Sequence, residues 1–229
     1  GYSYSGKILM GTAYGLASFI ILTNEGLYTW GETSYYSAVT TGTATFRKIA
    51  LPLGISPYDI KSISATMGAT KGLAYSLTLK NGKVITRNIF AATNGTITTD
   101  PFLNGAGLNT RTNDYTEVVT TNNIPITGIT HTVMSNATAF AFNKLERKFY
   151  TWGYATSLGD GTASASRNFA TEMINPLPSG VDPLWIQVTS ESNNKLATYY
   201  ILGSNGRVYT TGNARDGQTG QGNTTDLLT

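Results

Sequence analysis

The stretch FYTWGYATSLGDG, from Phe149 to Gly161, decides the fold because its first half recurs elsewhere in the chain. An earlier copy, LYTWGE, runs from Leu27 to Glu32. Two weaker copies, VITRN and VYTTG, end at Asn88 and Gly212, so that the four motifs end roughly 60 residues apart. A period of this length is typical of repeat architectures in which each repeat is one supersecondary unit.

A second marker upstream of the motif gives the register of the repeat. It is a pair of apolar residues spaced by three, which occurs at Ile60/Ile63, Ile126/Ile129 and Trp185/Val188. About 24 residues separate this pair from the end of the motif each time, and the same count places the first strand of the first unit in KILM, which begins at Lys7. The chain is therefore predicted to be one segment of four units, at residues 7–59, 60–125, 126–184 and 185–229.

Each unit also contains a run of strand-forming residues that leads into a turn. The clearest runs, AYSLTLKNG and TYYILGSNG, contain Asn81-Gly82 and Asn205-Gly206. Asn-Gly is a strong signal for a type I′ hairpin, because both central residues of that turn need positive φ. Charged residues make up only 13% of the chain. We therefore predict an all-β protein in which each unit opens with three antiparallel strands.

Composition argues against several classes of partner and site. The 16 basic and 13 acidic residues are spread along the chain, so nucleic acid is not expected as a partner. The longest apolar run, Leu16 to Leu22, is too short to cross a bilayer, and no membrane insertion is expected. The absence of cysteine removes disulfides, thiolate metal sites and cysteine nucleophiles.

The fourth unit, SNGRVYTTGNARDGQTGQG, resembles the regulator-of-chromosome-condensation repeat. It keeps that repeat's Val208, Tyr209 and regularly spaced glycines, with Thr211 in place of tryptophan and Thr219 in place of leucine. The third unit keeps Trp152, Gly153, Leu158, Gly159 and Gly161. The first keeps only the Trp-Gly half, and the second has Arg87-Asn88 where Trp-Gly would stand.

This resemblance implies a β-propeller of four-stranded antiparallel blades, of which about four are present. Complete propellers of this type are similar to seven-bladed rings, so the chain is expected to be part of a larger ring or a fragment of a longer protein. The alternatives are a compact four-bladed ring and an arc completed by further blades of another chain. The style of the sequence resembles bacterial extracellular members.

Several conspicuous residues have a structural interpretation. Trp30 and Trp152 are expected to pack between blades, because each stands at a strand end before a glycine. The glycines of GDG and GQTGQG are expected to form tight turns, since no helix start follows them to bind phosphate. His131 is expected to be a satisfied strand residue, and Asp160 and Asp216 stand alone, so we expect no catalytic residue, no metal and no cofactor.

The candidate binding residues lie where the repeat gives no structural reason for them, and we expect them in loops of the blades. Tyrosine and arginine provide contact area and hydrogen bonds at low entropic cost, and loops on a rigid scaffold often carry function. These candidates are Tyr35, Tyr36, Asn88, Phe90, Tyr154 and Arg215.

Three functions follow as hypotheses. The first is a non-enzymatic binding or adhesion module of a secreted or cell-surface protein, which contacts a protein or a glycan through its blade loops. The second, implied by the resemblance, is a protein inhibitor or a nucleotide-exchange-type regulator built on the same scaffold. The third is a lyase or hydrolase that uses tyrosine and arginine on the propeller face.

Overall fold

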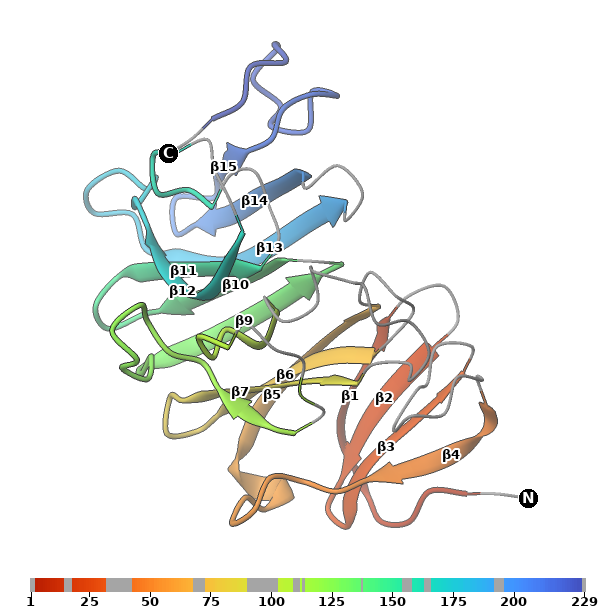
Figure 1. Cartoon of the computed structure of the whole chain (residues 1–229). Helices are drawn as coiled ribbons and strands as arrows, with labels where there is room; N and C mark the ends of the chain where they lie inside the picture. The colour runs from red at the N-terminus through yellow and green to blue at the C-terminus, as the bar shows by residue number, and fades with distance from the viewer. Residues whose placement is uncertain are drawn as a thin grey trace.

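The structure is a computed structural model in which strands form four separate antiparallel sheets (Figure 1). It describes residues 3–14, 18–31, 43–67, 73–89, 103–108, 112, 114–136, 138–153, 158–162, 166–191 and 196–227. The described helical residues are the short 3-10 helix η1 (Pro57–Asp59) and a 3-10 segment at Leu103 and Asn104, and neither is long enough to cross a membrane. The predicted all-β class is confirmed.

Consecutive strands pair side by side within each sheet, and we call the sheets blades 1 to 4. Blade 1 contains β1 (Ile8–Tyr14), β2 (Ser18–Thr23), β3 (Gly26–Gly31) and β4 (Thr43–Ile49). Blade 2 contains β5 (Ile60–Met67), β6 (Leu73–Leu79), β7 (Val84–Ile89) and β8 (Thr116–Glu117). Blade 3 contains β9 (Ile129–Ser135), β10 (Thr138–Asn143), β11 (Lys148–Gly153) and β12 (Arg167–Met173). Blade 4 contains β13 (Pro183–Glu191), β14 (Leu196–Gly203) and β15 (Val208–Gly212).

The first strands of the blades lie next to one another in chain order. β1 packs on β5, β5 on β9 and β9 on β13, and Figure 1 shows the four sheets fanned out from blade 1 to blade 4. No comparable packing joins blade 1 to blade 4 within the residues that the structure describes. The blades therefore form an arc of a propeller rather than the compact four-bladed ring that was one alternative.

Three apolar cores fill the seams between successive blades. The core between blades 1 and 2 includes Ile20 and Leu22 from β2 and Tyr75 and Leu77 from β6. The cores of the other two seams are built in the same way, around Trp152 between blades 2 and 3 and around Phe140 between blades 3 and 4. Because successive strand residues point to opposite faces, one blade contributes to two seams.

Hydroxyl groups on the first strands fasten one blade to the next. The backbone N–H of Met134 donates to Ser64 Oγ at 2.9 Å, and that of Asn136 donates to Thr66 Oγ1 at 2.6 Å. At the following seam the backbone N–H of Ser190 donates to Ser135 Oγ at 3.1 Å. The Thr- and Ser-rich composition therefore serves the joints between blades as well as the surface.

The third strands occupy the positions that the motif predicted. Gly31, Gly153 and Gly212 pair with Ser18, Thr138 and Thr198 at equivalent points of their blades. All three glycines have positive φ, at 114°, 118° and 105°. A left-handed backbone of this kind strongly favours glycine, which explains why the motif ends in this residue.

Two details differ from the sequence-based expectation. In the hairpins at residues 79–83 and 203–207 only Gly82 and Gly206 have positive φ, at 85° and 77°, so the turns are not type I′. Each is a three-residue loop in which the glycine takes the left-handed position of a bulge, closed by the bonds from Leu79 N–H to Lys83 C=O and from Gly203 N–H to Arg207 C=O.

The second difference is in blade 4, where the described residues form three strands instead of four. Leu227 pairs with Gly212 in an isolated antiparallel bridge. The equivalent glycines Gly31 and Gly153 pair with Thr43 and Arg167, the first residues of β4 and β12. Leu227 therefore stands where the fourth strand of a blade begins.

Candidate functional site

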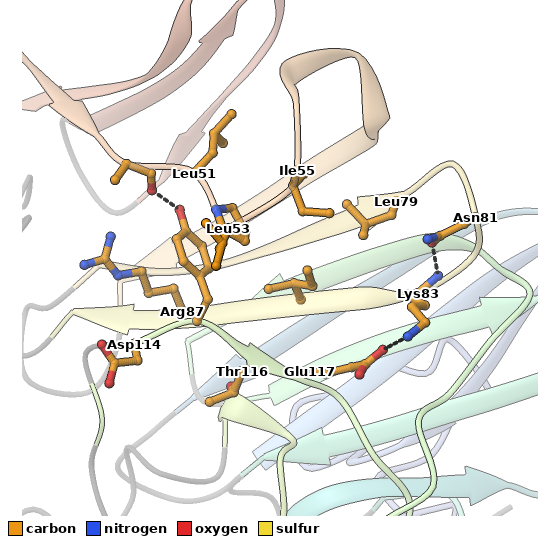
Figure 2. Close-up of a pocket in the computed structure, with 14 residues that line it drawn as sticks. Leu51, Leu53, Ile55, Leu79, Asn81, Lys83, Arg87, Asp114, Thr116 and Glu117 are labelled. Atoms are coloured by element: carbon orange, nitrogen blue, oxygen red, sulfur yellow. Dashed lines mark hydrogen bonds and ion pairs between the residues drawn. The ribbon is translucent and has the colours of Figure 1, made fainter.

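A groove opens at the outer end of the seam between blades 1 and 2, with a volume of about 590 Å³ (Figure 2). Three segments far apart in the sequence line it: residues 50–55 after β4, residues 79–87 of the β6–β7 hairpin, and residues 114–117 leading into β8. The apolar core of the seam lies directly beneath, because Leu51, Ile55 and Ile85 pack against its buried residues.

The middle of the groove is apolar and partly open to solvent. Leu51, Leu53 and Ile55 of the segment after β4 line one side of it, and Figure 2 shows Ile55 beside Leu79. The side chain of Leu53 is fully exposed, although it extends from a fixed turn in which the Ile55 N–H donates to the Pro52 C=O at 3.1 Å. An exposed aliphatic side chain on an ordered turn can anchor a partner, since its burial is favourable and the backbone that carries it needs little ordering.

One end of the groove is formed by Arg87, Tyr115 and Asp114. The guanidinium of Arg87 lies over the ring of Tyr115, 5.0 Å from its centroid, which is a cation–π contact. The Tyr115 hydroxyl lies 2.7 Å from the Tyr75 hydroxyl and donates to the Ala50 carbonyl at 2.8 Å. Tyr115 thereby ties blade 2 to the chain segment that carries Leu53.

The opposite end of the groove carries an ion pair. Lys83 Nζ lies 2.7 Å from Glu117 Oε1, and both side chains remain partly exposed. The Asn81 side chain bends back to accept the Lys83 backbone N–H at 3.1 Å, so the hairpin that carries Lys83 is ordered. The groove thus has an aliphatic centre and charged ends.

Tyr115 of the groove and Tyr75 buried beneath it keep their protons at neutral pH. Burial raises the pKa of Tyr75 well above its usual value, and burial also raises the pKa of Tyr115. For Arg87, burial acts to lower the pKa, but the neighbouring Tyr75 and Tyr115 outweigh it and the pKa is raised. The cluster therefore offers a fixed positive charge and neutral phenols, which suit recognition.

A second hollow, of about 380 Å³, lies where the first strands of all four blades converge. His131 lines it and sits on β9, with its Nδ1 3.0 Å from Thr130 Oγ1 and its ring edge-on to Trp185. Burial, with Lys61 and Lys144 nearby, lowers the pKa of His131. In the described part of the chain, no three His, Asp or Glu side chains group as metal ligands would.

Two of the predicted binding residues fall in described regions. Asn88 is not in a loop: it lies in β7 and is only 4% exposed. Arg215 is exposed in the segment after β15, and the neighbouring Asp216 and Gln218 line a polar hollow of about 210 Å³. Tyr35, Tyr36, Phe90 and Tyr154 lie outside the described residues. The binding role of all six stays a prediction.

The structure therefore brings together a set of residues that the sequence did not single out as a site. Arg87 carries the one signal that could have pointed to it, since arginine stands where the repeat has tryptophan in β3 and β11. Arg87 pairs across the sheet with Tyr75, as Trp30 pairs with Phe19 and Trp152 with Ala139, so it occupies the same face of its blade.

Comparison with known proteins gives results at the level of structure alone. No protein-family model matches the sequence, and no curated protein matches it by sequence. Among solved structures, human WBSCR16 superposes with a TM-score of 0.69 and 14% identity, over 99% of this chain and 52% of that one. Yeast RCC1 (Prp20), solved with Kap60 bound, superposes with a TM-score of 0.58 and 16% identity, over 86% of this chain and 40% of that one.

A second structure of Prp20p from Saccharomyces cerevisiae, whose binding properties to Gsp1p and histones are described with it, gives a TM-score of 0.59 at 16% identity over 86% of this chain and 42% of that one. The chain thus spans about half, or less, of the length of the structures it matches. Together with the four blades and their equivalent glycines, these likenesses confirm the predicted resemblance: the chain has the β-propeller fold of RCC1-type repeats.

Proposed function

We propose that the chain is a non-enzymatic binding module for a protein partner, and that the groove between blades 1 and 2 holds an extended segment of that partner. The single observation that carries this proposal is the composition of the groove. Fully exposed Leu53 stands beside Leu51 and Ile55 over an aliphatic floor. An apolar centre with a polar rim is the usual anatomy of a protein interface.

The ends of the groove suggest the chemistry of the bound segment. Arg87 and Asp114 at one end and the Lys83–Glu117 pair at the other place both signs of charge at each end, so each end can bind polar groups of the partner. A central aliphatic or aromatic side chain would pack against Leu53. The volume of about 590 Å³ is enough for a few side chains and not for a whole domain.

The class of partner is supported by the proteins of the same fold. Yeast RCC1 has been solved bound to Kap60, and Prp20p is described as binding Gsp1p and histones, so propellers of this architecture bind proteins. The likeness to this chain is one of fold, and fold does not carry a particular partner with it. Our proposal therefore names a protein, and none of these partners.

Affinity capture with matched variants tests the groove. The tagged chain, its Leu53→Asp variant and its Leu145→Asp variant are compared on one extract. Leu145 is 91% exposed on the β10–β11 turn of blade 3 and is the control for adding a charge at an exposed leucine. We expect a protein that binds the unchanged chain and Leu145→Asp but not Leu53→Asp. An identical bound set for both variants would contradict the proposal.

We also propose an extracellular or cell-surface location, and an adhesive role there, on composition alone. The support is a surface rich in Thr, Ser and Asn and a chain with no cysteine. A glycan partner belongs to the same hypothesis, and a glycan array probed with the chain and with its Arg215→Ala variant tests it. Fractionation of the source cells with an antibody against the chain tests the location, and recovery in the cytosolic fraction would contradict it.

A further inference from the structure

The hollow of about 380 Å³ along the first strands has His131 and Trp185 in its wall. Two bonds from β9 to β5 each join residues 70 positions apart, so these strands run parallel in a fixed register. The same offset places Lys61 of β5 beside His131. A bond between β9 and β13 joins residues 55 positions apart and places His131 level with Ile186, the neighbour of Trp185. Three successive blades therefore bring Lys61, His131 and Trp185 to one level.

The wall at this level has hydrogen-bonding groups without partners. The Nδ1 of His131 lies 3.0 Å from Thr130 Oγ1, and its Nε2 has no hydrogen-bond partner among the described residues. The ring is edge-on to that of Trp185, with centroids 5.8 Å apart, and Trp185 is 57% exposed. Thr132 of the same wall is 5% exposed, and its hydroxyl has no partner in the described part of the chain.

The charge around this level is positive. Lys61 on β5 and Lys144 on the β10–β11 turn are both exposed, and neither forms an ion pair within the ranges that the structure describes. The carboxylates close to them in sequence are engaged elsewhere. Asp59 accepts the hydrogen bonds that begin η1, and Glu146 lies 3.6 Å from Lys148 Nζ. The residues of β1 and β13 in the wall carry no charge.

This environment couples the imidazole to the charge of a ligand. Burial lowers the pKa of His131, and the charges of Lys61 and Lys144 lower it further, so the ring is mainly neutral at pH 7. An anion bound at this level would offset the two lysines and favour the protonated ring. Anion binding and protonation of His131 should therefore strengthen each other.

We propose that the hollow binds a small aromatic carboxylate, with its carboxylate between Lys61 and His131 and its ring against Trp185. Hydrogen bonds from a cation to a carboxylate are among the strong ones, and an exposed indole offers a second ring both apolar area and a favourable stacking geometry. The volume of about 380 Å³ is within the range of small-ligand sites. This site is separate from the groove between blades 1 and 2 and does not depend on it.

NMR titration tests the site directly, because His131 is the only histidine of the chain and gives a single imidazole signal. N-acetylphenylalanine is the probe, and N-acetylphenylalanine amide is the matched uncharged control. We expect the probe to shift the signal with a Kd on the order of 1 mM and the amide to bind at least about tenfold more weakly. The pKa of His131 should rise in the complex, so the probe should bind about tenfold more tightly at pH 5.5 than at pH 7.5.

Matched variants assign the contacts. Lys61→Met should weaken the probe by about tenfold and raise the pKa of His131 in the free chain, because it removes a neighbouring positive charge. Lys80→Met, at an exposed lysine of the β6–β7 turn, should change neither quantity. Trp185→Leu should weaken the probe without removing its dependence on pH. Leu53→Asp, in the groove, should bind the probe as the unchanged chain does, which keeps this test apart from that of the proposed function.

Several results would overturn the proposal. One is an unshifted His131 signal at about 10 mM probe, tenfold above the expected Kd. Equal binding of the amide would mean that the ring alone holds the ligand, and equal binding of inorganic phosphate would mean that charge alone does. A pKa of His131 that does not rise in the complex would place the carboxylate away from the imidazole.

Discussion

Trp30 and Trp152 occupy the same position in their blades, yet only Trp152 is buried by a neighbouring blade. Its indole N–H is bonded to the Leu103 carbonyl, and Gly105 lies so close that an added Cβ would come within 3.0 Å of the ring. The same motif thus has two consequences in one chain. It fastens blade 3 to blade 2, and it leaves an aromatic face on blade 1.

Alanine at the two tryptophans should therefore have unequal effects on stability. Trp152→Ala removes a fully buried ring and its hydrogen bond, and we expect the free energy of unfolding to fall by about 3–5 kcal/mol. Trp30→Ala removes a partly exposed ring and should cost clearly less. Urea denaturation of both variants, followed by circular dichroism, measures the difference. Equal losses would mean that the two positions are packed alike.

A pair of hairpin glycines separates backbone strain from a steric clash. Gly82 and Gly206 both have positive φ, so alanine at either position should cost about 1–2 kcal/mol in conformation alone. A Cβ at Gly82 would lie 2.5 Å from the backbone nitrogen of Gly128, whereas nothing lies within 4 Å at Gly206. Gly82→Ala should therefore lower the melting temperature well beyond Gly206→Ala. A matching decrease for both would show that the blade 2–blade 3 contact at Gly128 can move.

Thr78 offers a substitution that should raise stability. It is buried on the face of blade 2 that is directed toward blade 3, at the position where blades 1 and 3 have Leu22 and Phe142. Among the described residues, its hydroxyl has no hydrogen-bond partner. Thr78→Val keeps the shape and removes the unsatisfied group, so we expect the free energy of unfolding to rise by about 1 kcal/mol. Thermal unfolding by calorimetry measures this. A loss of stability would show that the hydroxyl is hydrogen-bonded in solution.

Buried tyrosines should make the fold sensitive to alkali. Burial raises the pKa of Tyr14 to about 12, and the hydrogen bond between its hydroxyl and that of Thr29 acts in the opposite direction. The unfolded chain loses this proton near pH 10 while the folded chain keeps it, so stability is full below pH 10 and falls as the pH rises toward 12. For Tyr14 the loss is roughly 2–3 kcal/mol, at about 1.4 kcal/mol per pKa unit.

The Tyr14→Phe variant is the matched control for this pH dependence, because it lacks the titrating hydroxyl. Its free energy of unfolding should fall less steeply between pH 10 and 12 than that of the unchanged chain. The slope does not vanish, since burial also raises the pKa of Tyr75 and Tyr199. Identical slopes for the two proteins would contradict the assignment of Tyr14 as a buried phenol.

The repeat could be recognised from sequence because its signals are local and backbone-driven. Gly31, Gly153 and Gly212 have left-handed conformations that exclude most other residues, so glycine recurs at these three equivalent strand positions, whereas blade 2 has Asn88 there without a positive φ. The GDG and GQTGQG glycines also have positive φ, between 68° at Gly220 and 83° at Gly161. Their reading as turns is confirmed for the same reason.

The groove could not be found in the same way, because it depends on contacts between distant segments. The hydroxyls of Tyr75 and Tyr115 are hydrogen-bonded to each other, and the Tyr115 hydroxyl donates to the carbonyl of Ala50, in the segment that follows blade 1. No periodic pattern in the sequence indicates that these distant residues are in contact. The prediction of a type I′ turn was wrong for a local reason: Asn81 uses its side chain to accept the Lys83 N–H, which favours the three-residue loop over a left-handed asparagine.

Acrylamide quenching of single-tryptophan variants tests most directly the claim that successive blades pack face to face and bury the side chains between them. Trp152 is kept alone by Trp30→Phe with Trp185→Phe, and Trp30 is kept alone by Trp152→Phe with Trp185→Phe, at a concentration where sedimentation gives a monomer. The account predicts that Trp152 is protected from the quencher, because blade 2 covers it, and that Trp30 is accessible. An accessible Trp152, or a Trp30 as protected as Trp152, would contradict the arrangement of the blades.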